Sequence, residues 1–493
     1  MKKLFLPVFL LGIFFTSCSK DDVQEEVEEV EEIEKIDPEE IEVESFIYSG
    51  MNEIYLYKAD VPELADDFFS STLDKDKFLA SYDSPEVLYE DLQPEFDDFS
   101  FMHHDYEELI KMFSGISKSN GIDFGLTYIE EGSNALWGYV RYVLPGTSAE
   151  DQGVKRGDIF TSINGIKLND ENYQKLLTGD TYSIDINRIE EGKFVSSGKT
   201  ITLVSSEYKE NPIFRYDILE VEGKKIGYLL YNGFTGTDEF DSQLNSVFAE
   251  FKNASVSDLV LDLRYNGGGS VETAVDLASM ITGQYKNEIF IKEFWNEKYQ
   301  NAWSSENYLT RFDSQIRTGE TTNSLGLNKV HIIATRSSAS ASELIINGLE
   351  PYIDVVHIGK TTRGKFQAST TLYDAPNFYR TDSEGNVHVN PNHKYVIQPL
   401  IFKSANKDGK TDFVDGLFPD IDIRENLSNY GTLGDISEPL LQAALNSILG
   451  IAQETASANQ KRMNRPELKM LGESDMFLPN YQRMYENNLP ILK

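Results

Sequence analysis

The chain has 493 residues, enough for two or three domains of ordinary size. Its 40% hydrophobic and 12% aromatic content supports a substantial core rather than disorder. A formal net charge of −36, without a cluster of Lys and Arg, argues against binding to nucleic acid or to anionic lipid headgroups. Since no group of His and Cys has ligand spacing, we expect no metal and no other cofactor.

The first 17 residues have the pattern of a secretory signal, with two lysines, an apolar run and then small residues. Cys18, the only cysteine, follows at once. The stretch Phe15-Thr16-Ser17-Cys18 resembles the lipobox of bacterial lipoproteins. This resemblance implies lipidation of Cys18 and a lipid-anchored protein of the cell envelope, periplasmic or surface-exposed on the outer membrane.

Residues 18–45 are dominated by acidic side chains, with fourteen acidic residues and one lysine between Asp21 and Glu44. Because neighbouring glutamates repel each other at helical spacing, we expect a solvated, extended tether. Residues 46–119 combine aromatic and acidic residues at helical spacing, which predicts a helical N-terminal unit.

Residues 120–207 contain short strand-like runs separated by turns. The stretch from Gly146 to Gly165 resembles the core motif of a PDZ domain. The resemblance implies a small β-rich domain in which backbone N–H groups of one segment capture the C-terminus of a peptide that adds a strand. That segment is Asp123, Phe124, Gly125 and Leu126.

Residues 208–450 alternate strand-like and helical patterns, which predicts an α/β core with a parallel-rich sheet and flanking helices. The nearly continuous apolar run from Asp258 to Arg264 indicates a buried parallel strand. It ends at three consecutive glycines that begin at Gly267, and a helical pattern follows. Residues 451–493 form a polar tail to which the sequence assigns no role.

A second strand, Val330 to Ala334, ends in small residues before a helical pattern. Ser340 and Glu343 have the spacing of a capping box, so we expect Ser340 at the helix N-terminus. A sharp strand-to-helix turn points a side chain out of the sheet edge and leaves unpaired N–H groups beside it. Although this pattern is most often only a cap, it is also a suitable place for a nucleophile.

The Ser340 segment resembles the nucleophile segment of the carboxy-terminal processing proteases, serine peptidases of family S41 that use a Ser–Lys dyad. In that family a Gly-Lys pair follows, with the lysine 25 residues after the serine, and here Lys365 follows Gly364. The glycines after Arg264 resemble the family's second motif. By this resemblance, Gly268 or Gly269 and Ala341 would supply the N–H groups of an oxyanion hole.

A serine–lysine mechanism requires a neutral lysine, so we expect an apolar environment to lower the pKa of Lys365. In the family a glutamine four residues after the lysine often orients it, but this chain has Ser369 there. Gln367 lies on the same face of the expected strand. The third member therefore stays open between Ser369 and Gln367.

We predict from these patterns a serine endopeptidase that cleaves exported proteins or peptides and recognises their C-termini through the PDZ domain. The alternative is a catalytically inactive lipoprotein that binds peptides. The presence together of Ser340, Lys365 and the glycine turn favours the peptidase.

Overall fold

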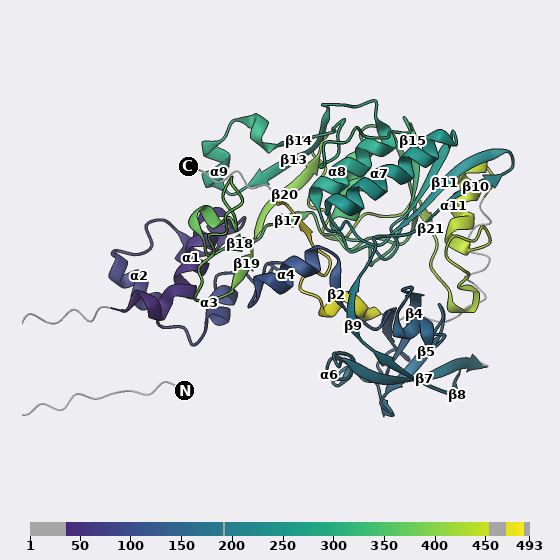
Figure 1. Cartoon of the computed structure of the whole chain (residues 1–493), viewed down its shortest axis with the longest axis horizontal. Coiled ribbons are helices and arrows are strands. Elements are labelled where there is room, and N and C mark those ends of the chain that lie inside the picture. Colours follow the sequence, from purple (N-terminus) through teal and green to yellow (C-terminus); the bar gives the residue numbers. More distant parts are fainter. Residues whose placement is uncertain (1–35, 191–192, 453–469, 488–493) are drawn as a thin grey trace, which may run out of the picture.

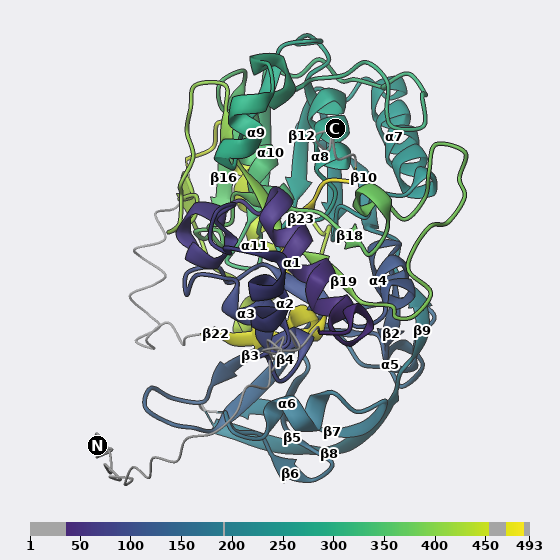
Figure 2. The same cartoon turned by 90° about the vertical axis from the view of Figure 1, so that its left-hand side faces the viewer.

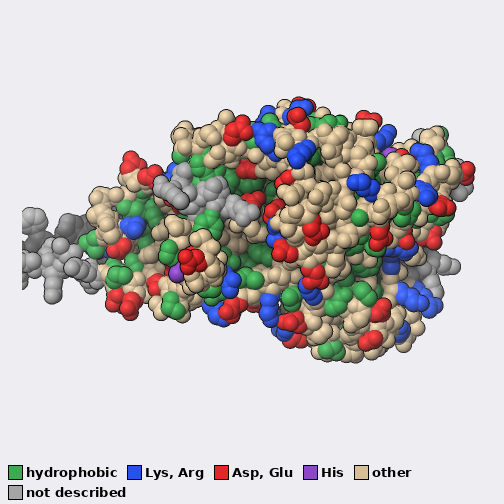
Figure 3. Space-filling view, turned by 45° about the horizontal axis from the view of Figure 1, so that its top comes forward, with side chains coloured by type: hydrophobic (Ala, Val, Ile, Leu, Met, Phe, Trp, Pro, Cys, Tyr) green, Lys and Arg blue, Asp and Glu red, His purple; other side chains and the backbone are tan. Residues whose placement is uncertain are grey.

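The computed structural model describes residues 36–190, 193–452 and 470–487. The predicted signal segment and Cys18 lie outside these residues. Figure 1 shows three parts: N-terminal helices, a central α/β core, and a β-rich domain. Among the described residues, no helix is long and apolar enough to cross a membrane. Acidic and basic side chains are interspersed over the face shown in Figure 3.

The core contains a six-stranded sheet in the order β10-β11-β12-β15-β16-β21. Strand β10 is antiparallel to β11, and all the other neighbours are parallel, which confirms the predicted parallel-rich sheet. The strands are β10 (Ile213–Val221), β11 (Lys224–Tyr231), β12 (Asp258–Asp262), β15 (Lys329–Ala334), β16 (Asp354–Gly359) and β21 (Ile421–Asp422).

Helices cover both faces of this sheet because successive strand residues point to opposite sides. Leu229 and Leu261 belong to a core cluster shared with α7 (Asp238–Asn253), α8 (Val271–Thr282) and α10 (Ala341–Leu349). Tyr228 and Val260 face the other way, toward α11 (Pro439–Leu449). The sheet is therefore buried on both faces, as its apolar strands predict.

A five-stranded sheet packs beside the first one. Its order is β14 (Leu309–Arg311), β13 (Ile289–Trp295), β20 (Leu400–Asn406), β17 (Gln367–Ser369) and β23 (Met484–Tyr485). A small sheet joins β1 (Phe101–His103), β19 (Val396–Gln398) and β18 (Leu372–Tyr373). The remaining short elements of the core are α9 (Glu297–Ala302), η4 (Ser305–Tyr308), η5 (Pro376–Phe378) and η6 (Leu427–Asn429).

The β-rich domain has its own core, separate from the two core clusters of the α/β part. Its sheet order is β22 (Met470–Glu473), β3 (Ile122–Tyr128), β4 (Leu136–Val143), β5 (Ile159–Ile163), β7 (Thr181–Glu190) and β8 (Lys193–Val204), with β6 (Ile166–Lys167) paired to β5. Two short helices, α5 (Ser148–Asp151) and α6 (Tyr173–Leu177), pack on it. Strands β2 (Ile116–Ser119) and β9 (Ser206–Lys209) pair where the chain enters and leaves.

The N-terminal helices are nearest the viewer in Figure 2. They are η1 (Pro38–Ile41), α1 (Glu42–Ile54), η2 (Lys58–Asp60), η3 (Pro62–Leu64), α2 (Thr72–Leu79), α3 (Pro85–Asp91) and α4 (Tyr106–Phe113). The predicted extended tether through residue 45 is therefore wrong from Pro38 onward. Asp37 caps the first turn, and burial of Ile41 and Phe46 outweighs the repulsion between nearby glutamates.

Candidate active site

Ser340 occupies the sharp turn between β15 and α10, as the sequence predicts. Its backbone has φ 61° and ψ −113°, a sparsely populated region that costs on the order of 1–3 kcal/mol for a residue with a Cβ. The side chain is fully buried. Ser340 and Glu343 form a capping-box arrangement at the start of α10, but Oγ of Ser340 makes no hydrogen bond of acceptable distance and angle. A strained turn therefore holds an unpartnered hydroxyl.

Glu343, one turn along α10, connects this turn to the segment that carries Lys365. Its Oε2 accepts hydrogen bonds from the backbone N–H groups of Ser340 and Lys365, both at 2.8 Å. Its Oε1 accepts from the Gly364 N–H at 2.7 Å and from the Thr362 hydroxyl at 2.5 Å. The backbone N–H groups of Ser340 and Lys365 thus donate to the same oxygen of Glu343, which holds the two backbone segments next to each other.

Lys365 is fully buried, and its Nζ has no hydrogen-bond partner. The amine lies 4.3 Å from the ring centroid of Phe99, which comes from the N-terminal unit. Burial lowers the pKa of Lys365 well below its usual range, and the positive charge of Arg483 lowers it further. An amine in this environment is a suitable base for a hydroxyl proton.

The glycine turn after β12 lies against the serine. Gly268 has φ 111°, and a Cβ placed there would lie 2.8 Å from the Cβ of Ser340. Gly269 has φ 135°, and a Cβ there would lie 2.3 Å from the carbonyl oxygen of Phe234. Both positions require glycine. In this structure the Gly268 N–H donates to Oδ1 of Asn266 at 2.9 Å, while Ala341 begins α10 directly after Ser340.

The polar residues before the glycines form a buried ionic network. Arg264 is fully buried and pairs with Asp262 at 2.7 Å, Glu438 at 2.8 Å and Glu425 at 3.1 Å. Since Glu438 also caps α11, the network fixes the end of β12 to that helix. Removing one partner of such a network typically costs about 3–5 kcal/mol. In this motif Asp262 and Arg264 therefore anchor the end of β12, whereas the glycines that follow lie against Ser340.

Neither candidate for the third member contacts the amine of Lys365 in this conformation. The Gln367 side chain donates to the hydroxyl of Tyr57 at 2.9 Å. The Ser369 hydroxyl donates to the carbonyl oxygen of Met484 at 3.2 Å. Both residues lie in β17, and their polar atoms bond to these other groups.

Comparison with known families agrees with this geometry. Residues 225–423 match the model described as Peptidase family S41, which spans β11, the glycine turn, Ser340, Lys365 and β21. Residues 42–101 match the Peptidase S41 N-terminal domain, and this match begins at the first residue of α1. The chain belongs to peptidase family S41.

Individual S41 relatives are distant in sequence. Carboxyl-terminal-processing peptidases 1 and 3 of Arabidopsis thaliana, both chloroplastic, are 22% identical over 289 residues and 26% identical over 252 residues. These matches cover 57% and 48% of this chain and 55% and 44% of the relatives, so the chain spans about half of their length. A crystal structure from Bacteroides fragilis NCTC 9343, assigned to the S41 proteases, is 27% identical with a TM-score of 0.63. It covers 83% of this chain and 97% of that one.

The predicted peptide-binding residues Asp123, Phe124, Gly125 and Leu126 all lie in β3 of this S41 chain. The edge of β3 that a peptide would use is occupied by β22. This strand runs antiparallel to β3, with Glu473 opposite Gly125 and Gly472 opposite Leu126. The Phe124 N–H donates to the hydroxyl of Ser474 at 3.3 Å, and that hydroxyl donates to Asp123 at 2.5 Å. Part of the tail thus lies where an added peptide strand was expected.

Three residues of the site were not predicted from the sequence. Phe99 and Arg483 lie far from Lys365 in the chain, and no local pattern connects them to it. Glu343 was identified only as a helix cap, although an acidic residue that ends fully buried in α10 accepts from both catalytic segments.

Proposed function

We propose that this chain is a serine endopeptidase that hydrolyses peptide bonds of exported proteins, with Ser340 as nucleophile and Lys365 as base. The observation that carries the proposal is the Glu343 carboxylate, one oxygen of which accepts from the backbone of both residues. Their hydroxyl and amine are buried without hydrogen-bond partners, which is a costly arrangement for polar groups with no further role.

In the proposed reaction, neutral Lys365 takes the proton of the Ser340 hydroxyl while Oγ attacks the carbonyl carbon of the substrate. When the tetrahedral intermediate collapses, Lys365 returns the proton to the leaving amine, and an acyl ester of Ser340 remains. Lys365 then takes a proton from water as the water oxygen attacks the ester carbon. When the C–Oγ bond breaks, Lys365 gives this proton to Oγ of Ser340, and the new carboxyl end is released.

The developing oxyanion is assigned to backbone N–H groups. Ala341 begins the helix after Ser340, and the second donor comes from Gly268 or Gly269. Loss of one such donor typically costs on the order of 3 kcal/mol in the barrier. Because the Gly268 N–H donates to Asn266, it must give up that bond to serve as an oxyanion donor.

The β-rich domain, residues 120–207, is proposed as a PDZ domain that recognises the C-termini of substrates. Support comes from β3, whose edge accepts an antiparallel strand, and from the Phe124 N–H, which donates to an oxygen at the end of that strand. With Cys18 as a lipidated anchor, we place the enzyme in the bacterial cell envelope. Its partners are then protein or peptide substrates and the membrane.

The proposal is tested by cleavage of a fluorescently labelled casein, an unstructured protein, by the chain lacking residues 1–18. Ser340→Ala should lower the rate at least about 1000-fold. The control Ser437→Ala changes an exposed serine and should keep the wild-type rate. Equal cleavage by both variants would remove the peptidase and leave a peptide-binding lipoprotein.

A further inference from the structure

Residues 470–487, here called the tail segment, contact both the β-rich domain and the catalytic core. Strand β22 adds to the edge of β3, and β23 adds in parallel to β17, the strand that follows Lys365. Figure 2 shows β22 beside β3 and β23 within the core. One short segment thus occupies two edges at which an extended peptide could bind.

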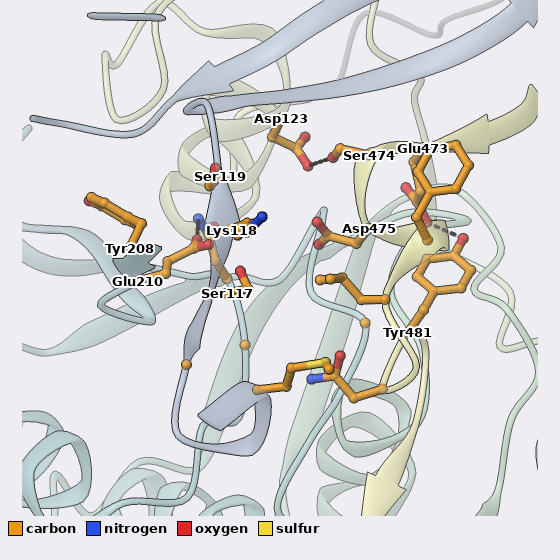
Figure 4. Close-up of a pocket in the computed structure, with 18 of the residues that line it drawn as sticks. Ser117, Lys118, Ser119, Asp123, Tyr208, Glu210, Glu473, Ser474, Asp475 and Tyr481 are labelled. Carbon is orange, nitrogen blue, oxygen red and sulfur yellow. Dashed lines mark hydrogen bonds between the residues drawn. The ribbon is translucent and has the colours of Figure 1, made fainter. Parts of the chain in front are cut away.

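In the β-rich domain the tail segment covers an apolar surface along β3, here called the groove. Leu471, Met476 and Phe477 pack against the core of that domain, together with Tyr173 and Leu176 of α6. At the end of the groove, Ser474 binds Asp123, as Figure 4 shows. The serine oxygen thus takes the place at β3 where a peptide carboxylate would accept.

Glu473 connects this groove to the catalytic turn. Its buried carboxylate pairs with Arg141 of β4 and accepts a hydrogen bond of 2.6 Å from Ser337, three residues before Ser340. Tyr481 donates to the other carboxylate oxygen at 2.5 Å (Figure 4). Glu473 of the tail segment thus links Arg141 of the β-rich domain to Ser337 of the core.

In the cleft, the tail segment lies between the glycine turn and β17. The Tyr485 N–H donates to the carbonyl oxygen of Gly269 at 3.0 Å, and the Glu486 N–H donates to that of Ser369 at 2.9 Å. A Cβ placed on Gly268, which would lie 2.8 Å from the Cβ of Ser340, would also lie 3.0 Å from the carbonyl oxygen of Arg483. Tail backbone therefore lies directly beside the nucleophile.

Under this cover neither Ser340 nor Lys365 exposes any surface, so a peptide cannot reach the hydroxyl while the tail segment is in place. We infer that the tail segment is an internal ligand of the substrate path, which runs from the edge of β3 to the edge of β17, and that a substrate binds only when it displaces this segment. The inference rests on the proposed peptidase function and adds its regulation.

The direction of the tail segment favours a competitor over a substrate in position for cleavage. It passes the groove first and the cleft second, whereas a substrate held by its C-terminus in the groove would place earlier residues in the cleft. Its hold is also incomplete. A cavity of about 540 Å³ lies between the segment, the glycine turn and the β-rich domain, and Oδ1 of both Asp123 and Asn480 is buried without a hydrogen bond. Weakly held segments of this kind open locally.

A reversible disulfide tests the inference within one protein. Thr127 and Met470 lie opposite each other across β3 and β22, so Thr127→Cys with Met470→Cys brings two thiols within bonding reach. The chain without residues 1–18 has no other cysteine. The oxidised form should cleave casein at least about tenfold more slowly than the reduced form. Equal rates with a complete disulfide would overturn the inference.

A second arm measures occupancy without catalysis. Leu471→Glu with Phe477→Glu should release the segment, and Val195→Glu is the control on an exposed position of β8. A labelled peptide of residues 470–487 should bind the released variant at least about tenfold more tightly than the wild type or the control. Equal binding to all three would overturn the inference. Absence of cleavage by every form, with the expected peptide binding, would instead refute the peptidase and leave the internal ligand.

Discussion

Glu343 shows how much a single buried carboxylate can organise. It accepts hydrogen bonds from the Ser340, Gly364 and Lys365 N–H groups and from the Thr362 hydroxyl. Burial raises the pKa of Glu343, while the surrounding donors hold the charged form. Glu343 bonds the backbones of Ser340 and Lys365, so in the proposed mechanism its role is to position the nucleophile and the base.

We expect Glu343→Gln to lower kcat about 100-fold with little change in KM. The amide NH2 group of Gln would face backbone N–H groups that also donate, and the resulting repulsion would shift Ser340 and Lys365. The free energy of unfolding should fall by about 1–3 kcal/mol. The matched control, Glu350→Gln, changes a surface partner of Lys410 next to the same helix and should leave both values unchanged. Steady-state kinetics and urea unfolding measure them. A loss of stability with wild-type kcat would mean that Glu343 only supports the fold.

At the scale of elements, β22 and the short helix η7 (Ser474–Phe477) bring acidic groups into a buried place beside β3. Burial raises the pKa of both Asp123 and Asp475, and it raises that of Glu210, which follows β9, to about 7. Arg141 of β4 and Glu473 of β22 face the same group and stay paired as ions. Figure 4 shows Asp475 and Glu210 on opposite sides of the cavity.

These pKa shifts make the docking of the tail segment depend on pH. Asp123, Asp475 and Glu210 bind protons more tightly in the docked state, so docking weakens as pH rises through about 7. The pKa of Glu473 is lowered instead, so Glu473 does not titrate in this range. Hydrogen-exchange protection of residues 470–477, corrected for intrinsic rates, should be lower at pH 9 than at pH 6. Asp475→Asn should reduce this dependence. Protection that rises with pH in the wild type would contradict the account.

At the scale of the whole molecule, three parts of the chain meet at Lys365: the core, the N-terminal unit and the tail segment. The core supplies the residue and Glu343 of α10, the N-terminal unit supplies Phe99, and the tail segment supplies Arg483. Burial of the amine by these parts is the main cause of its lowered pKa. The lowered pKa of Lys365 is therefore a property of the assembled chain rather than of its local sequence.

The same distinction separates what the sequence could predict from what it could not. The parallel strands and the turn at Ser340 depend on local patterns, and both lie as expected. Local charge repulsion does not predict the helix that begins at Glu42, because this helix is stabilised by the core that buries Phe46. The tail segment was missed because its strands gain their order from pairing with β3 and β17, which no local pattern shows.

The most direct test of the account is a comparison of two lysine variants in the same loop. Lys365 is buried and unpartnered, whereas Lys360 is partly exposed and pairs with Asp422 at 2.9 Å. We predict that Lys365→Met, which keeps the length and removes the base, lowers the rate of casein cleavage at least about 1000-fold, while Lys360→Met keeps it. Cleavage by the folded Lys365→Met protein at the wild-type rate would contradict the serine–lysine mechanism.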